Sequence, residues 1–448
     1  MHGQDAALPT VLFGLNPMGL ATTLFVITYV VVMTEKVNRA IVALVAAGLM
    51  IISGVLDQKA ALEGVDFNTL GLLIGMMAIV AITRQSGVFQ YLAIWSAKKV
   101  NARPWGILVM LSLVTAVTSA FLDNVTTVLL IVPVALVITE ELKVNPYPYL
   151  FSMIFSSNIG GTATLIGDPP NIMIGSAVGL TFNDFVYHLT PAIIVVMAAT
   201  LVPIYLVWGR HLTAADADRQ RVMQFNEREA ITDPRLLRQC LAVIALVVLA
   251  FVLAHPLGLE VATIALFGAA VLMLLHNLGH QAEDQAKNVH HVFSEVEWVT
   301  IFFFIGLFIV VHGVDTTGLL KLLADWVVQM TGGDLTATAM VVMWVSAVLS
   351  AVVDNIPFVA TMIPVIKSMA PTFGGSEQLL PLWWSLSLGA CLGGNGTLVG
   401  ASANLVVAGM AERTGNPIRF LRYTFLAFPL MLLSIVICNV YVYWRYLV

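Results

Sequence analysis

Apolar runs long enough to cross a membrane recur from one end of the chain to the other, with short polar segments between them. A helix of about 20 apolar residues spans the hydrocarbon core of a bilayer. The pattern predicts such helices over residues 16–33, 40–55, 68–83, 188–208, 240–254, 259–275, 297–313 and 424–445. The short alternating segments of a membrane β-barrel do not appear. We therefore predict an all-α polytopic membrane protein.

Two longer apolar stretches, 104–139 and 335–370, each carry an acid and an amide near the middle. These pairs are Asp123-Asn124 and Asp354-Asn355. An apolar residue follows each pair directly, which favours a re-entrant hairpin with the acid at its tip. Two full helices joined by a turn are the alternative. An aspartate at this depth is costly and usually marks an ion or substrate pathway; a purely helix-capping pair is the structural alternative.

Two more stretches, 147–178 and 381–410, contain residues that interrupt a helix. Pro169 and Pro170 lack an N–H group and clash with the preceding turn, and neighbouring glycines add backbone freedom. Backbone groups left unpaired at membrane depth persist only where they line a cavity or are buried in protein. A broken helix of this kind points to a transporter binding site, and a kinked structural helix is the alternative.

The chain repeats itself with a shift of 231 residues. The first acid-amide pair falls on the second, and after a two-residue slip Asn171 falls on Asn404. Asp168 falls on Ala401, so the two halves differ at that position. One extra span, 240–254, separates the halves, and the second half therefore starts from the opposite side of the membrane. This arrangement predicts an inverted repeat.

The repeat divides the chain into four parts, with about 10 crossings and two hairpins. The parts are an N-terminal segment with the first span (1–39), repeat 1 (40–208, hairpin 104–139, broken helix 147–178), a cytoplasmic loop with a linking span (209–258), and repeat 2 (259–448, hairpin 335–370, broken helix 381–410).

Composition agrees with a membrane protein and excludes several classes. Charged residues make up 10% of the chain, whereas a soluble domain has about 25%. The net charge of −5 gives no indication of a nucleic-acid partner. Cys240, Cys391 and Cys438 lie far apart in apolar segments, which predicts free thiols and no metal site. We expect no cofactor, and the N-terminus lacks the basic region of a cleavable signal peptide.

Basic residues are distributed unevenly between the two sides of the membrane. If the predicted spans alternate, one side receives only Lys59, Lys321, Lys367 and Arg445 of the 21 Lys and Arg residues. The richer side should be cytoplasmic. We therefore predict a multi-pass protein of the cell (inner) membrane with both termini outside the cytoplasm.

The hairpin tips and the broken helices should meet near the midplane and form the site. The candidate substrate-binding residues are Asn124, Thr126, Asn158, Gly161, Thr162, Thr164, Asn171, Asn355, Asn395, Thr397, Ser402 and Asn404. The candidate proton carriers are Asp123, Asp354 and Asp168, because removal from water disfavours a charged carboxylate. No span carries an evident Lys or Arg for an anion, and Arg84 lies nearest. The set suits a neutral polyhydroxy molecule or a cation.

At these residues the chain resembles the ion transporter superfamily. The two acid-amide tips and the run Gly-Gly-Thr-Ala-Thr-Leu-Ile-Gly-Asp-Pro-Pro-Asn are most similar to the ArsB-like arsenite permeases and the related melanosomal P protein. The resemblance implies a scaffold domain and a transport domain that moves by an elevator mechanism. Proteins of this superfamily are commonly homodimers. Dicarboxylate symporters of the superfamily carry Ser-Asn-Thr at the tips. The aspartates found here instead disfavour an anionic substrate.

The resemblance implies export of arsenite, and of antimonite, in exchange for protons. Arsenite at neutral pH is mostly arsenous acid, a small triol that amides and hydroxyls can bind by hydrogen bonds. A cytosolic ATPase subunit is a further candidate partner besides the lipid bilayer. A sodium/proton antiporter that uses the same acids is the alternative, followed by a dicarboxylate or other anion symporter. An intramembrane aspartyl protease would need a Gly-x-Gly-Asp signature, which is absent, and we expect no enzyme.

Overall fold

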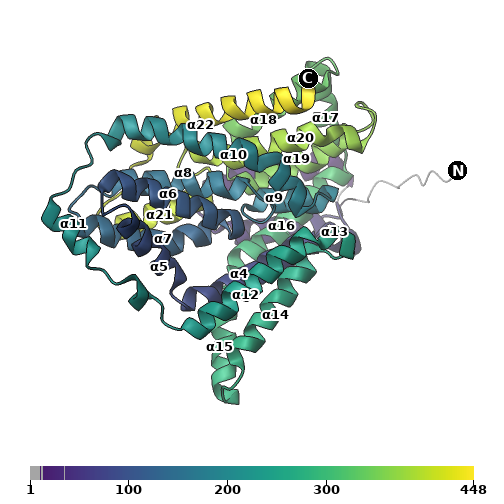
Figure 1. The fold of residues 1–448 in the computed structure, drawn as a ribbon. Helices are drawn as coiled ribbons and strands as arrows, with labels where there is room; N and C mark the ends of the chain where they lie inside the picture. The colour runs from purple at the N-terminus through teal and green to yellow at the C-terminus, as the bar shows by residue number, and fades with distance from the viewer. Residues whose placement is uncertain (1–10, 12–13, 35) are drawn as a thin grey trace.

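The computed structural model describes residue 11, residues 14–34 and residues 36–448 (Figure 1). The described residues form helices and no strand, which confirms the predicted fold class. Ten helices form the part of the molecule that contains the site, here called the site group: α6 (Pro104–Phe121), α7 (Asn124–Glu141), α8 (Tyr147–Thr162), α9 (Pro169–Val178), α10 (Phe182–Ile204), α18 (Leu335–Ser350), α19 (Asn355–Ser368), α20 (Leu380–Gly393), α21 (Ser402–Arg413) and α22 (Phe420–Val442).

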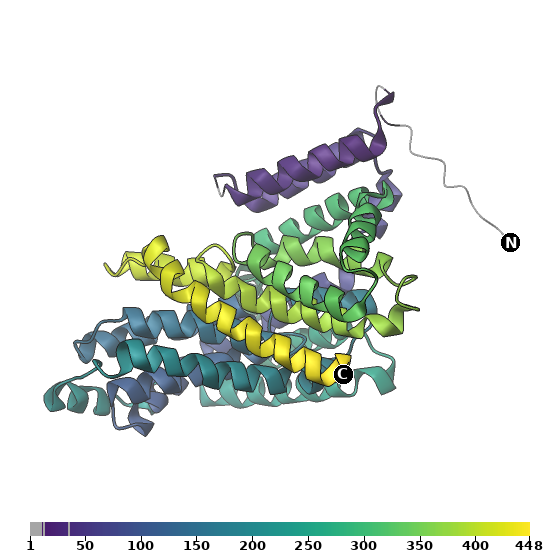
Figure 2. The same cartoon turned by 90° about the horizontal axis from the view of Figure 1, so that it is seen from above.

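Six further apolar helices pack beside them and are here called the support group: α1 (Pro17–Met33), α2 (Arg39–Ile52), α4 (Phe67–Gln85), α12 (Pro234–Val252), α14 (Val261–Asn277) and α16 (Trp298–Thr316). Figure 2 shows α1 and α2, in purple, as a pair along one edge of the molecule. Three short helices connect the two groups: α5 (Val88–Lys99), α11 (Asp216–Met223) and α17 (Leu319–Met330). Three more lie between helices of the support group: α3 (Gln58–Glu63), α13 (Ala254–Leu257) and α15 (Ala282–Ser294).

Seven helices among the described residues are long and apolar enough to cross a membrane, or eight if the bent pair α17 and α18 counts as one span. This number is lower than the crossings expected from the apolar runs. Helices α1, α2 and α14 are shorter apolar helices, and each broken stretch consists of two short helices rather than one span. Both arms of the first hairpin, α6 and α7, qualify by length, so the re-entrant course of that hairpin stays a prediction.

The support group is held by close contacts at glycines. Helix α2 packs on α16 where Gly306 meets Ala43, and α14 packs on α4 where Gly75 meets Ala265. A Cβ atom at either glycine would lie within 2.6 Å of backbone on the other helix. In lipid there is no hydrophobic drive between apolar helices, so such close approach provides the packing contacts that hold them together.

The site group contains the same contacts twice. Helix α6 packs on α8 and α18 packs on α20. The hydroxyl of Ser119 donates to the Ser157 carbonyl at 2.7 Å, and the hydroxyl of Ser350 donates to the Ala390 carbonyl at 2.6 Å. The sequence repeat pairs Ser119 with Ser350 and Ser157 with Ala390, so the two hydrogen bonds occupy equivalent places in the two halves. They support two structurally equivalent halves, while the inversion of the halves across a membrane stays a prediction.

The loop between the halves is anchored on α5 and α7 by ion pairs. Lys98 contacts Glu227 at 2.5 Å, and Arg221 contacts Glu141 at 3.2 Å. The hydrogen bond from Lys98 lowers the pKa of Glu227 below its ordinary value. These residues all belong to the side that the charge distribution predicts to be cytoplasmic.

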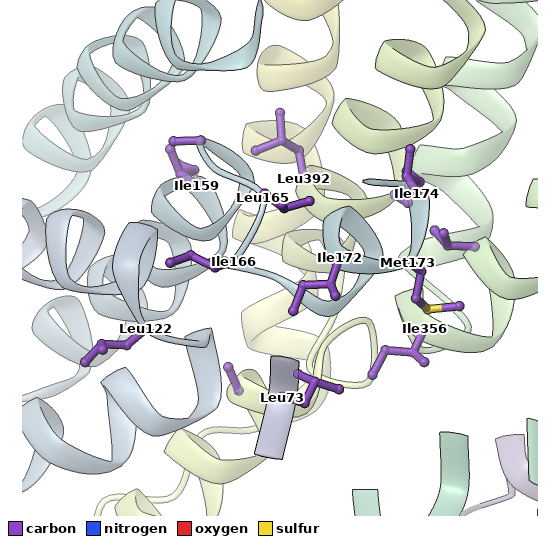
Figure 3. Close-up of a cluster of buried hydrophobic side chains, with 14 of the residues drawn as sticks. Leu73, Leu122, Ile159, Leu165, Ile166, Ile172, Met173, Ile174, Ile356 and Leu392 are labelled. Atoms are coloured by element: carbon purple, nitrogen blue, oxygen red, sulfur yellow. The ribbon is translucent and has the colours of Figure 1, made fainter. Parts of the chain in front are cut away.

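Apolar side chains fill the space around the first break (Figure 3). Leu165 and Ile166 lie within the break itself, and Ile172, from α9, and Leu392, from α20, lie beside it. All four are almost completely buried. The irregular backbone is therefore enclosed by protein, as a break at membrane depth requires.

Gly389→Ala should destabilise the protein by about 1–3 kcal/mol, the usual cost of overpacking. A Cβ atom there would lie 2.5 Å from the Met343 carbonyl oxygen and would force α20 away from α18. The measurement is thermal unfolding in detergent. Gly409→Ala is the matched control, because nothing lies within 4 Å of its Cβ position. Equal melting temperatures for the two variants would contradict the packing argument.

Tags at residues 1 and 448 should both be reachable from outside intact cells, and a tag in the loop 209–238 only after the membrane is permeabilised. The expectation follows from the uneven distribution of basic residues. Accessibility to a membrane-impermeant reagent is the measurement. A C-terminal tag that is protected in intact cells would overturn the predicted inversion of the repeats.

Candidate functional site

The two aspartates of the hairpin tips cap helices. Asp123 precedes α7 and accepts the Thr126 N–H at 2.8 Å, and Asp354 precedes α19 and accepts the Ile356 N–H at 3.1 Å. Such a cap satisfies one N–H group at a helix start. Each carboxylate has a second oxygen, which bonds the Thr126 hydroxyl at Asp123 and a side-chain cluster at Asp354. Both aspartates therefore cap a helix, and the second oxygen of each carboxylate makes a further contact.

The two breaks are held by equivalent asparagines. The side chain of Asn171 donates to the carbonyls of Thr162 and Thr164 at 3.1 and 2.9 Å. The side chain of Asn404 donates to the carbonyls of Gly394 and Thr397 at 2.8 and 2.9 Å. These bonds satisfy carbonyls that the helix breaks leave free. Both asparagines therefore stabilise the backbone of the breaks. The sequence analysis had predicted only that these two side chains bind substrate.

A network of amide side chains links the two halves. Asn124 donates to the Asn158 oxygen at 3.1 Å, and Asn158 donates to the oxygens of Asn395 and Asn404 at 2.9 and 3.0 Å. All four side chains are buried. The Asn395 nitrogen has no acceptor among the described residues. The predicted meeting of tips and breaks is therefore visible in the geometry, and it includes one buried donor that remains available.

Asp168 lies at one end of this network, 1% exposed. Its carboxylate faces the amide nitrogens of Asn124 and Asn355, each 3.4 Å from Oδ1. It directly precedes α9, whose first two residues are prolines. An acid at this place is enclosed by both hairpin tips and by the first break. The corresponding residue of the second half, Ala401, cannot provide a charge.

Arg39 is a charged residue at the second tip that the sequence analysis did not select. Its Nη1 lies 2.8 Å from Asp354 Oδ2 and 2.9 Å from the Ser402 oxygen, and its Nη2 lies 3.2 Å from the Thr300 oxygen. The sequence analysis found no evident Lys or Arg in the spans to receive an anion, whereas the structure brings Arg39 to the second tip, where it pairs with Asp354. Arg39 was counted as a residue at the membrane surface, but it begins α2, and the packing of α2 on α16 brings its long side chain to the second tip.

A cavity of about 20 Å³ lies between the tips. Its charged lining residues are Arg39, Asp123, Asp168 and Glu297. This volume accommodates about one water molecule or one small ion. A larger cavity of about 320 Å³ adjoins the ion pair and is lined by Arg39, Asp354, Phe303 and Ser402, among others.

Several residues that were predicted to bind substrate instead donate hydrogen bonds to backbone carbonyls of the protein. The hydroxyl of Thr164 donates to the Ala120 carbonyl, that of Thr397 to the Ala351 carbonyl, and that of Thr162 to the Asn158 carbonyl. Gly161 allows close approach, because a Cβ there would lie 2.6 Å from the Gly167 oxygen. These residues support the breaks, while Asn124 and Asn355 face the acid and Asn158 and Asn395 continue the amide network.

Glu297, Thr300 and Ser387 also reach the site without having been selected from the sequence. Thr300 donates to Glu297 at 3.1 Å, and Ser387 donates to the Asn171 oxygen at 2.6 Å. The repeat pairs Glu297 with Asp66, another acid that precedes a helix, and this pairing was the available signal. Cys391 donates to the Asn171 oxygen at 3.5 Å, so this thiol contacts the first break from the second half.

Comparison with known proteins gives a consistent family. Residues 29–389 match the family CitMHS, citrate transporter. An uncharacterised transporter of Mycobacterium tuberculosis is 42% identical over 434 residues, covering 96% of this chain and 99% of that protein. The 46 kDa membrane protein of Mycobacterium leprae is 40% identical over 438 residues, covering 96% of this chain and 99% of that protein.

The P protein of Sus scrofa is 33% identical over 496 residues, covering 93% of this chain and 58% of that protein. The crystal structure of the YdaH transporter of Alcanivorax borkumensis, described as having an unusual topology, has a TM-score of 0.59 at 14% identity, and the match covers 96% of this chain and 98% of that one. At that identity the likeness shows the fold alone. The predicted superfamily and kinship with the P protein are confirmed, and the arsenite permease branch stays a prediction.

Asn404→Ala should destabilise the protein by about 1–3 kcal/mol or more, because it leaves buried groups without partners. The carbonyls of Gly394 and Thr397 would lose their donor, and Asn158 would lose an acceptor. Thermal unfolding is the measurement. Asn416→Ala is the control, because the Asn416 side chain is exposed and, in the described part of the chain, donates only to the nearby Thr414 carbonyl. Equal melting temperatures for the two variants would show that the Asn404 side chain does not stabilise the break.

Proposed function

This chain is a membrane transporter of the CitMHS citrate transporter family, and we propose from that premise that it exports arsenite in exchange for protons. The transported species would be arsenous acid, with antimonite as a related substrate. The observation that carries the proposal is the buried amide network around Asp168. It offers donors and acceptors to an uncharged molecule and one acid that can exchange a proton.

The amides suit an uncharged oxyacid. Each asparagine presents both a donor and an acceptor, and a triol needs both. The Asn395 nitrogen is a buried donor without an acceptor among the described residues. Such a group is costly unless a ligand pairs with it. An oxygen of arsenous acid would supply that acceptor when substrate enters between the tips.

The charges around the tips disfavour citrate and other polycarboxylates. Asp123, Asp168 and Glu297 line the small cavity, against one guanidinium from Arg39. Arg39 is already paired with Asp354. An anion with several charges would meet more negative than positive groups, and like charges at close range repel. The name of the family is therefore not sufficient reason to propose citrate as the substrate of this chain.

Proton coupling would rest on the acids at the tips and the first break. Asp123 makes no ion pair among the described residues, and its carboxylate accepts hydrogen bonds from the N–H and the hydroxyl of Thr126. Asp168 bonds neutral amides. A carboxylate in such surroundings can take up a proton on one side of the membrane and release it on the other. The neutral form crosses the low-dielectric barrier at less cost.

The boundary between the support group and the site group is where an elevator motion would occur. Asn124, Asn158 and Asn355 lie on helices of the site group, and Asn395 lies between α20 and α21 of that group, so all four would travel together with bound substrate. A homodimer that fixes the support group is part of the same proposal. A cytosolic ATPase would act from the loop side.

A sodium/proton antiporter is the second candidate, and one observation favours it. The cavity between the tips has a volume of about 20 Å³ and carboxylate side chains in its wall, and oxygen ligands suit small hard cations. This reading uses the same acids. It differs in requiring sodium movement without arsenite.

The test uses inside-out vesicles with an acidic lumen and compares arsenite, sodium and citrate. The proposal expects arsenite accumulation that collapses with the pH gradient. Sodium flux in its place would establish the antiporter. Efflux of citrate together with protons from vesicles preloaded with citrate would overturn both.

Asp123→Asn and Asp354→Asn, singly and together, should test the coupling in the same vesicles. Asparagine has nearly the shape of aspartate but cannot titrate. At least one variant should lose gradient-driven accumulation and still bind arsenite. Unchanged accumulation and pH dependence in the double variant would exclude both tips, and Asp168 would be the remaining candidate.

A further inference from the structure

The Arg39–Asp354 ion pair joins the support group to the site group. Arg39 and Thr300 belong to α2 and α16, and Asp354 and Ser402 precede or begin α19 and α21. The pair is only partly exposed, with 25% of the Arg39 side chain and 17% of the Asp354 side chain accessible. Phe303, on α16, lies under the guanidinium, whose carbon is 5.1 Å from the ring centre. The guanidinium is thus fixed on the support side.

A second contact crosses the same boundary nearby. The hydroxyl of Tyr29, on α1, donates to the Pro357 carbonyl at 2.6 Å and lies 2.6 Å from the Thr361 oxygen, both on α19. Together with Arg39, Tyr29 holds the first turns of α19 against the α1–α2 pair. The second tip is therefore bound to the support group by one charged and one neutral interaction.

The first tip has no such partner. Arg39 lies four residues before Ala43, the residue that packs on Gly306, and Val261 lies four residues before Ala265, which packs on Gly75. Valine thus occupies the place on α14 that matches Arg39 on α2. Asp123 makes no ion pair among the described residues. In the part of the chain that the structure describes, an ion pair therefore holds the second tip but not the first.

Movement of the site group away from α2 would leave Asp354 without its counter-charge. Breaking a buried pair by removing one partner is strongly unfavourable, because an uncompensated charge remains. A proton on Asp354 removes that charge. Arg39 would keep partners on its own side, because Thr300 accepts its hydrogen bond and donates to Glu297.

We propose that Arg39 is a positioning residue whose ion pair with Asp354 latches the second hairpin tip to the support group until a proton neutralises Asp354. The inference rests on the proton coupling proposed above. In the step, Asp354 Oδ2 accepts the proton and the N–H···O⁻ contact with Arg39 is lost. The other charged groups that line the cavity beside Arg39 are Asp123, Asp168 and Glu297. The latch allows the site group to leave this position only with a proton bound.

The experiment measures distances between spin labels at Ala286→Cys, on α15, and Glu412→Cys, on α21, in the full chain without substrate. Both positions are exposed, whereas Cys240, Cys391 and Cys438 are buried. One distance population should dominate at high pH, and a second should grow as pH falls. Arg39→Gln should lower the ratio of the first population to the second at high pH by about 10-fold or more, since hydrogen bonds to charged groups contribute that much. Asp354→Asn should give a low ratio at every pH.

Arg39→Lys retains the charge and should restore most of the pH dependence. Arg84→Gln is the matched control, because Arg84 and Glu295 form a pair of the same 2.8 Å distance outside the site group, and it should behave as the unaltered chain. An unchanged pH profile in Asp354→Asn, or an equal effect of Arg84→Gln, would overturn the latch. The spin-label experiment contains no substrate, so its result does not depend on which substrate is transported. If the distances change with pH as expected but the vesicles do not transport arsenite, the proposed substrate is wrong and the latch is retained.

Discussion

Asp168 is buried between the two halves, and the surrounding elements are arranged to satisfy its carboxylate. A charge or polar group away from water is costly unless it is hydrogen-bonded. The bonds come from Asn124 and Asn355, which are the first residues of α7 and α19. These amides reach the acid because both helices start inside the protein. The hairpin tips and the first break therefore depend on one another.

The breaks and tips could be predicted because their signals are local. Pro169-Pro170 cannot continue a helix from the preceding turn, and the observed break between α8 and α9 ends at these two residues. Asp123 and Asp354 stand out in apolar surroundings, and each begins the second arm of its hairpin. The repeat then places equivalent residues in equivalent bonds, as the Asn171 and Asn404 side chains show.

What escaped prediction depends on tertiary packing. Nothing near Arg39 in the sequence indicates that it reaches Asp354, which is 315 positions away. The contact results from the packing of α2 on α16 at Gly306, where small residues let the two helices approach closely. Likewise, the threonine hydroxyls of the breaks could hydrogen-bond a ligand, but in the structure they donate to backbone carbonyls. Residue type alone does not distinguish these two uses.

The amide network also has a direction, which originates in the backbone of the second half. Two carbonyls fix the Asn404 side chain with its nitrogen toward Gly394 and Thr397, so its oxygen must face Asn158. Asn158 then turns its own oxygen to Asn124, and Asn124 presents its nitrogen to Asp168. Each dipole sets the next. A loop in one half thereby dictates that the acid in the other half meets a donor, so carbonyl positions around Thr397 bear on the ionisation of a residue they never touch.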